Sequence, residues 1–270
     1  NESFRVVFIA DSHIIGPQYE CCSESEGIDN ESIVKTAVRL ENVVSQINLM
    51  EPAVDLVFMM GDVVHDAYSG ETFSWYTENH NAFRVARDIL DKLEAPFYPA
   101  FGNHDYHYKC NGVGHSKDLS HQLFQEFFAV DPFYTITHKG WNFIVANSQM
   151  GPSWDKDDDR CDTDKGSYGI QQLQWLEEQL EGGNPSIVMA HHMLPVTMSS
   201  EGQGDYAGIE TVLRNQIKTM KGFFVGHTHR WIDFTESYGF AHFVMGATRY
   251  DEDNFWLLQF YQDGTYEILD

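Results

Sequence analysis

The sequence lacks the features of a membrane or nucleic-acid-binding protein. No apolar run approaches the roughly 18 residues needed to cross a bilayer, so no membrane span is expected. Basic residues are scarce: 17 Lys and Arg stand against 41 Asp and Glu, giving a formal net charge of −24. That charge repels polyanions at long range, so no long nucleic acid or anionic lipid surface is an expected partner. A well-solvated acidic surface explains this net charge more simply than a specific function of the acidic residues.

Cysteines are few, and none are spaced as CxxC, which argues against a thiolate zinc site. All four stand in polar stretches that indicate loops: Cys21, Cys22, Cys110 and Cys161. A bond between the adjacent Cys21 and Cys22 would strain the peptide between them, so we expect each to bond to Cys110 or Cys161. Together with a start at Asn1 without an initiating Met, the cysteines predict a secreted, periplasmic or otherwise extracytoplasmic protein, although four reduced thiols remain the alternative.

The remaining composition is that of a folded protein, with 42% hydrophobic and 14% aromatic residues. No repeat, linker or composition break divides the chain, so we expect one domain over residues 1–270. Apolar runs predict strands at 4–10, 54–60, 97–101, 186–190 and 223–225, and a hairpin at 134–147. Amphipathic patterns predict helices at 31–49, 72–93, 119–128, 170–180 and 209–218. Residues 231–269 are expected to complete a second sheet with antiparallel strands, which gives an α/β fold of two sheets with helices outside.

Five of these apolar runs end in Asp, Asn or His. The segments are Asp11-Ser12-His13, Gly61-Asp62, Gly102-Asn103-His104-Asp105, His191-His192 and Gly226-His227-Thr228-His229. Because ligands gather at the carboxyl ends of parallel strands, we expect these side chains to converge. Oxygen and nitrogen donors without sulfur suit Fe, Mn or Zn, and an Asp can be shared between two such ions.

In order and in sequence, these blocks resemble the five signature blocks of the calcineurin-like metallophosphoesterase superfamily. The resemblance spans residues 11–229 and implies a four-layer α/β/β/α sandwich of two mixed sheets flanked by helices. It also implies a centre of two transition-metal ions, in which Asp62 bridges the metals. One ion would be held by Asp11, His13, Asp62 and His229, and the other by Asp62, Asn103, His191 and His227.

The resemblance further implies that a hydroxide between the metals attacks phosphorus while His104 assists the leaving group. Acid catalysis by a positioned histidine typically contributes about 10²–10⁴-fold. Many relatives have an Asp three residues after the bridging Asp, where it orients the catalytic histidine, but His65 occupies that position here. Asp66, Asp105 or neither could orient His104, and Asp66 is favoured. Purple acid phosphatases have a metal-binding Tyr at this position, so the chain is not expected to be one of them.

Several residues near the blocks are candidates for substrate contact. By analogy with relatives, His191 is preferred over His192 as the metal ligand, and His192 is expected to line the pocket. His65 follows the second block and is a further candidate. Tyr106 and His107 adjoin the third block, where packing is as good an explanation as contact with the substrate.

The expected substrate is a small phosphodiester. The Gly-His-Thr-His-Arg ending and the His-His pair are similar to class III cyclic-nucleotide and glycerophosphodiester enzymes, and a secreted form with cysteines resembles acid sphingomyelinase-like proteins. The alternative is a phosphomonoesterase of broad specificity, because the same metal core serves both reactions. A metal-loaded binding protein without catalysis is a further alternative, against which the complete ligand set and His104 argue.

Overall fold

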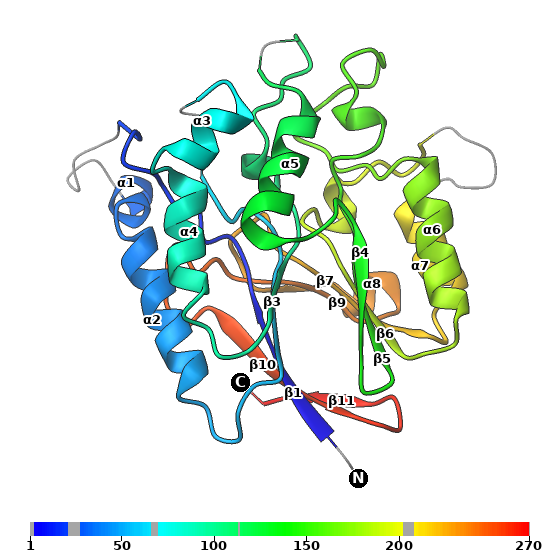
Figure 1. The fold of residues 1–270 in the computed structure, drawn as a ribbon. Coiled ribbons are helices and arrows are strands. Elements are labelled where there is room, and N and C mark those ends of the chain that lie inside the picture. Colours follow the sequence, from blue (N-terminus) through cyan, green and yellow to red (C-terminus); the bar gives the residue numbers. More distant parts are fainter. Residues whose placement is uncertain (1–2, 21–27, 66–69, 113, 202–207, 270) are drawn as a thin grey trace.

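The computed structural model describes residues 3–20, 28–65, 70–112, 114–201 and 208–269. Its strands form two mixed sheets (Figure 1). The five-stranded sheet has the order β11 (Tyr266–Ile268), β10 (Phe255–Tyr261), β1 (Ser3–Ile9), β2 (Leu56–Met59), β3 (Phe97–Pro99). The six-stranded sheet has the order β4 (Tyr134–His138), β5 (Trp141–Val145), β6 (Ser186–Met189), β7 (Met220–Val225), β9 (His242–Val244), β8 (Ile232–Asp233).

The two sheets pack face to face because their strands are apolar on both sides. In β1, Phe4, Val6 and Phe8 join one buried cluster, whereas Val7 and Ile9 join another on the opposite face. Alternate residues of a strand face opposite sides of its sheet, so both faces of β1 must be covered. The first cluster includes side chains of β5, β6 and β7 and forms the core between the sheets.

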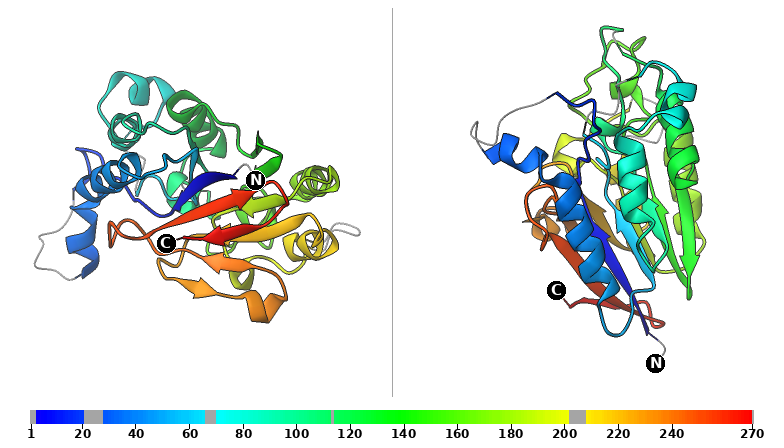
Figure 2. Two further views of the ribbon diagram at one scale, coloured as in Figure 1. Left: turned by 90° about the horizontal axis from the view of Figure 1, so that it is seen from below. Right: turned by 60° about the vertical axis from the view of Figure 1, so that its left-hand side comes forward.

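Helices cover the two outer faces. In the first half of the chain these are α1 (Ile28–Ile33), α2 (Thr36–Asn48), α3 (Phe73–Glu78), α4 (Ala82–Leu90) and α5 (Lys117–Phe128). The second half contains α6 (Ile170–Glu181), α7 (Ile209–Asn215) and the short α8 (Thr235–Tyr238). Side chains of α2, α4 and α5 pack on the five-stranded sheet, and those of α6 and α7 on the six-stranded sheet. The layers are seen edge-on in Figure 2. The predicted α/β/β/α sandwich is confirmed.

Two predicted helices are each divided in two. The predicted helix at 72–93 ends at Glu78 and restarts at Ala82. The reason is Asn81, whose side-chain oxygen accepts from the Arg84 amide at 3.2 Å while its Nδ2 donates to the Tyr76 carbonyl at 2.7 Å. Asparagine favours such capping bonds over the helix interior. The predicted helix at 31–49 is likewise split between α1 and α2.

The prediction for the C-terminal strands is wrong. They divide between the sheets: β8 and β9 extend the six-stranded sheet, and β10 and β11 belong to the five-stranded one. Strand β9 runs parallel to β7, whereas β10 runs antiparallel to β1 along its whole length, from Ser3–Tyr261 to Ile9–Phe255. Pairing with β10 covers the second edge of β1, which the sequence pattern of short strands and turns did not reveal. Within the described ranges, no helix is long and apolar enough to span a membrane.

Candidate metal centre

The predicted metal ligands follow the carboxyl ends of strands β1, β2, β3, β6 and β7. Seven non-glycine residues in the described part of the chain have positive φ angles. Five of these seven are predicted ligands: Asp11 (54°), His13 (49°), Asp62 (51°), His227 (79°) and His229 (60°). Residues other than glycine seldom adopt this backbone conformation. It costs about 1–3 kcal/mol per residue, and such residues cluster at functional sites. The backbone is therefore strained where the donors converge.

Glycines let these loops approach one another. Gly61 has a φ of +86°, and a Cβ at this position would lie 2.6 Å from Nδ1 of His191. A Cβ on Gly102 would lie 2.2 Å from Oδ1 of Asp62. A larger residue at either position would displace His191 or Asp62, which explains the glycine before the predicted ligands Asp62 and Asn103.

The first group of donors surrounds His13. Its Nε2 atom lies 2.9 Å from Nε2 of His229 and 3.4 Å from Oδ2 of Asp62. Oδ1 of Asp11 lies 3.6 Å from the same His229 nitrogen. One donor atom from each of the four residues lies within 4.8 Å of the others. This is the first predicted ligand set.

The second group surrounds His191. Its Nε2 atom lies 3.0 Å from Oδ1 of Asn103 and 3.2 Å from Nδ1 of His227. The same nitrogen is 3.3 Å from Oδ2 of Asp62, the oxygen that also faces His13. A single carboxylate oxygen of Asp62 thus stands between the two groups, in the position of a shared ligand.

The donor atoms fit transition-metal ions. Asp11, His13 and His191 are fully buried, and Asp62 is 1% exposed. Imidazole nitrogens face one another and carboxylate oxygens at 2.9–3.6 Å, an arrangement that buried lone pairs tolerate only with a proton or a cation between them. Oxygen and nitrogen donors without sulfur suit Fe, Mn or Zn. Together the two groups suggest a dinuclear metal site.

The electrostatics separate the two buried carboxylates. Burial raises the pKa of Asp11 well above its usual value, and the charge of Asp62 adds to this although His191 opposes it. Burial acts on Asp62 in the same direction, but His191 and His13 outweigh it and hold the pKa of Asp62 well below its usual value. Burial lowers the pKa of His227 to about 3, with His191 adding to the effect. Asp62 is therefore ionised and the His227 ring neutral, the forms that bind a metal, whereas Asp11 would release a proton on binding one.

The structure places the ring of His191, and not that of His192, among the donors. Nδ1 of His191 is 2.8 Å from the carbonyl of Met60, so it carries the proton and leaves Nε2 free to bind a metal. The His192 ring lies 4.3 Å from that of His227 and contacts the hydroxyl of Ser148 through Nδ1 at 2.8 Å. His192 is fully buried, and its Nε2 has no hydrogen-bond partner in the described structure.

His104 lies beside both groups. Its backbone N–H donates to Oδ1 of Asp62 at 2.8 Å, and Nδ1 of its ring donates to the backbone carbonyl of His65 at 2.7 Å. The Asp105 carboxylate accepts from the amides of Gly102 and Val64 at 2.8 and 3.0 Å. Burial, and then the charge of Asp62, raises the pKa of Asp105 to about 8. Asp66, the favoured orienting residue, lies outside the described residues.

A cavity of about 350 Å³ adjoins His104. Ten residues line it: His65, Asn103, His104, Tyr106, His107, Tyr108, Lys109, Trp154, Thr163 and Asp164. Of the predicted substrate contacts, His65 and His107 lie on its wall. The Tyr106 ring is 6% exposed, and its hydroxyl contacts Nε2 of His121 at 2.9 Å and Nδ2 of Asn147 at 2.8 Å, so it also packs the wall from behind.

A disulfide ties together two walls of this cavity. Cys110 follows the cavity residue Lys109, and it bonds to Cys161 in the loop that carries Thr163. This pairing corrects our expectation that Cys21 and Cys22 would each bond to one of these two cysteines. Spacing along the chain does not report which loops meet in space. Cys21 and Cys22 themselves lie outside the described residues.

Sequence reasoning missed the groups that hold the histidine rings of the site. The carbonyls of Met60 and His65 fix the proton positions of His191 and His104, and the hydroxyl of Ser148 contacts His192. A backbone carbonyl is common to every residue type, so nothing in the sequence marks these two. Ser148 follows strand β5, and its place after an apolar strand was the available signal.

The chain belongs to the calcineurin-like phosphoesterase family, whose model matches residues 4–231. It is therefore a metal-dependent phosphoester hydrolase, as the signature blocks predicted. No curated protein matches the chain.

Solved structures share its fold at low sequence identity. A dimetal phosphatase from Danio rerio is 15% identical with a TM-score of 0.61, and the match covers 96% of this chain and 93% of the other. A purple acid phosphatase from yellow lupin (Lupinus luteus) seeds is 14% identical with a TM-score of 0.57, with 99% and 51% covered. A 5'-nucleotidase precursor from Thermus thermophilus is 12% identical with a TM-score of 0.50, with 99% and 54% covered. This chain thus spans about half the length of the latter two.

Proposed function

We propose that the protein hydrolyses small phosphodiesters at a dinuclear centre bridged by Asp62. The observation that carries the proposal is the position of Oδ2 of Asp62, 3.4 Å from Nε2 of His13 and 3.3 Å from Nε2 of His191. In the proposed centre Asp11, His13 and His229 complete one site, and Asn103, His191 and His227 the other. Bound there, two ions would supply a nucleophile at neutral pH and neutralise charge on the phosphoryl group.

We assign the leaving-group proton to His104. Because Nδ1 donates to the His65 carbonyl at 2.7 Å, Nε2 is the ring nitrogen left to exchange a proton with the substrate. His104 lines the cavity, so a leaving group seated there lies next to the ring. The amide of His104 holds Asp62 in addition, so one residue aligns the proton donor with the shared ligand.

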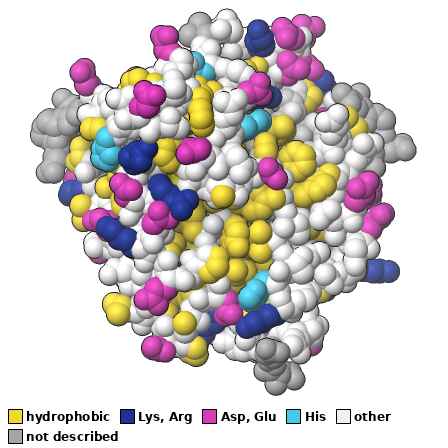
Figure 3. All heavy atoms as spheres, in the orientation of Figure 1, with side chains coloured by type: hydrophobic (Ala, Val, Ile, Leu, Met, Phe, Trp, Pro, Cys, Tyr) yellow, Lys and Arg dark blue, Asp and Glu magenta, His cyan; other side chains and the backbone are white. Residues whose placement is uncertain are grey.

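The charge around the centre favours diesters over monoesters. Within the described structure, Lys109 is the one lysine or arginine among the residues that line the cavity, and Asp164 opposes it. The whole chain has a formal charge of −24, and acidic side chains are spread over the face seen in Figure 3. A monoester dianion suffers more from this field than a diester monoanion. The second candidate, a phosphomonoesterase, keeps the same metal core.

Paired assays separate the two. The purified protein is loaded with Mn, Zn or Fe, its metal content is measured, and an aryl phosphodiester is compared with the matching monoester. We expect about two ions per chain and faster turnover of the diester. Turnover of the monoester alone would establish the phosphomonoesterase, and two bound ions without hydrolysis of either ester would establish a binding protein.

We also propose that the protein works outside the cytoplasm. The support is the disulfide between Cys110 and Cys161, since such bonds persist in oxidising compartments and are rare elsewhere. The test is expression of the full chain in a reducing and in an oxidising compartment, followed by titration of thiols and of activity. Equal activity with all cysteines reduced would contradict the proposal.

A further inference from the structure

The segments that carry His13 and His65 run side by side beyond the ends of β1 and β2. The amide of His13 donates to the carbonyl of Asp62 at 2.9 Å, and the amide of Ile14 to that of Val63 at 2.9 Å. The amide of His65 donates back to the carbonyl of Ile14 at 3.0 Å. Backbone hydrogen bonds therefore place the two histidines next to each other independently of their side-chain contacts.

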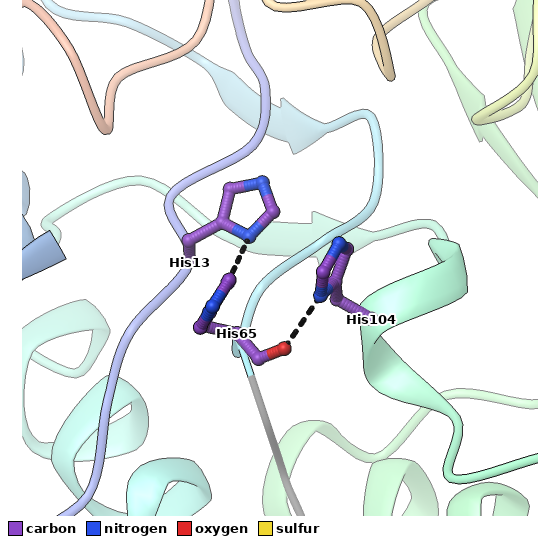
Figure 4. A group of neighbouring side chains, drawn as sticks. All are labelled: His13, His65 and His104. Carbon is purple, nitrogen blue, oxygen red and sulfur yellow. Dashed lines mark hydrogen bonds between the residues drawn. The ribbon is translucent and has the colours of Figure 1, made fainter. Parts of the chain in front are cut away.

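The two rings meet through their Nδ1 atoms, 3.0 Å apart (Figure 4). The other nitrogen of His13, Nε2, lies in the first donor group, 3.4 Å from Asp62 and 2.9 Å from His229. If Nε2 of His13 is a metal ligand, its proton must be on Nδ1, because a neutral imidazole has one proton. Nδ1 of His65 is then the acceptor, and the proton of His65 lies on Nε2.

His65 meets His104 in two further ways. Its backbone carbonyl accepts from Nδ1 of His104 at 2.7 Å, as Figure 4 shows. The two rings are also stacked, with centroids 4.8 Å apart and an interplanar angle of 17°. The same residue thus contacts a ring of the first donor group and the ring assigned to the leaving group.

We propose that His65 is a positioning residue that fixes the proton positions of two histidines at once. Its ring accepts from Nδ1 of His13 and leaves Nε2 of His13 to the metal, while its carbonyl accepts from Nδ1 of His104 and leaves Nε2 of His104 to the substrate. The inference rests on the proposed function, which makes His13 a ligand and His104 the acid. It gives His65 a role distinct from contact with the substrate.

The two contacts come from different parts of His65, so substitution separates them. His65→Phe removes the ring acceptor but keeps an aromatic ring for stacking and the carbonyl for His104. His65→Asn restores an acceptor oxygen near the position of Nδ1. The matched control is His80→Phe, because His80 is exposed.

Metal affinity is measured by chelator competition on each folded, full-length variant. Loss of an outer partner of a ligating histidine typically costs about 10–100-fold in metal affinity, and we expect that loss for one ion in His65→Phe. We expect His65→Asn to recover most of it and the control variant to match the wild type. Wild-type affinity for both ions in His65→Phe would overturn the inference.

A second measurement needs no variant. In the zinc-loaded wild-type protein, nitrogen NMR of the histidine rings reports which nitrogen carries each proton. We expect His13 and His104 to be protonated on Nδ1 and His65 on Nε2. A proton on Nδ1 of His65 would overturn the inference even if His65→Phe does not fold. A wild-type protein that binds no metal would instead overturn the proposed function.

Discussion

Replacing His104 with alanine tests the acid role with the smallest disturbance of the metal centre. The substitution removes the ring that donates to the carbonyl of His65. It keeps the backbone amide that donates to Oδ1 of Asp62 at 2.8 Å. Because the contact with the shared ligand does not involve the side chain, we expect His104→Ala to bind as many metal ions as the wild type.

The size of the effect depends on the leaving group. A positioned general acid contributes about 10²–10⁴-fold, or about 2.7–5.4 kcal/mol of the activation free energy. An alkoxide leaving group needs the proton, so we expect His104→Ala to lose that full factor on an alkyl ester. A nitrophenolate is stable without a proton, so we expect a much smaller loss on a nitrophenyl ester than on the alkyl ester.

The assay is kcat on both esters, with metal content and circular dichroism measured on the same samples. His80→Ala, a substitution at an exposed histidine, is the control for the change itself. An equal loss on the alkyl and nitrophenyl esters would refute the assignment of the leaving-group proton to His104. Loss of metal from His104→Ala would show that the ring supports the centre and does not act on the substrate.

Three further predictions concern the centre and the sheets. Asp62→Asn should weaken binding of both ions by more than the roughly 10–100-fold that loss of an outer partner costs, as chelator competition would show; retention of either ion at full affinity argues against bridging. Gly61→Ala should destabilise the protein by about 1–3 kcal/mol, because alanine there has a φ of +86° and its Cβ would lie 2.6 Å from His191; an unchanged melting temperature contradicts this. Burial raises the pKa of Asp55, but bonds from the backbone of β1 and from Lys139 outweigh it and lower the pKa. Asp55→Asn should therefore cost about 1–3 kcal/mol at pH 7, a difference that is complete above the unfolded pKa of about 3.9 and is lost as the pH falls through the lower folded value. Denaturation at pH 7 and pH 3 checks this, and an equal difference at both values contradicts it.

The convergence of the donors was predictable because it follows from strand direction. Asp11 and His191 come directly after an apolar run and Asp62 comes one glycine later, and parallel strands bring their carboxyl ends to one edge. The structure adds what the pattern could not contain. The same oxygen of Asp62 faces both groups, and the proton positions of the rings depend on backbone carbonyls that any residue would supply.

The errors have one physical origin, which is that sequence patterns are local. Asn81 has the residue type of a helix cap, yet the apolar periodicity on either side of it continues, so the pattern predicted one helix where there are two. The composition of strand β10 does not indicate which sheet it joins. Its membership of the five-stranded sheet follows from its pairing with β1. The partner of Cys110 is likewise set by the meeting of two loops 51 residues apart.

The position of the centre between two sheets links its chemistry to the core. The five-stranded sheet supplies Asp11 and Asp62, and the six-stranded sheet supplies His191 and His227. Neither sheet carries a complete ligand set, so the distance from Asp62 to His191 is fixed by the apolar cluster between the sheets. Metals that bind only the folded state stabilise it in proportion to the logarithm of their concentration. Each ion would bind residues that follow strands of both sheets, so this stabilisation opposes separation of the sheets. The free-energy cost of the strained φ angles of the ligands is offset by the metal contacts that these angles make possible.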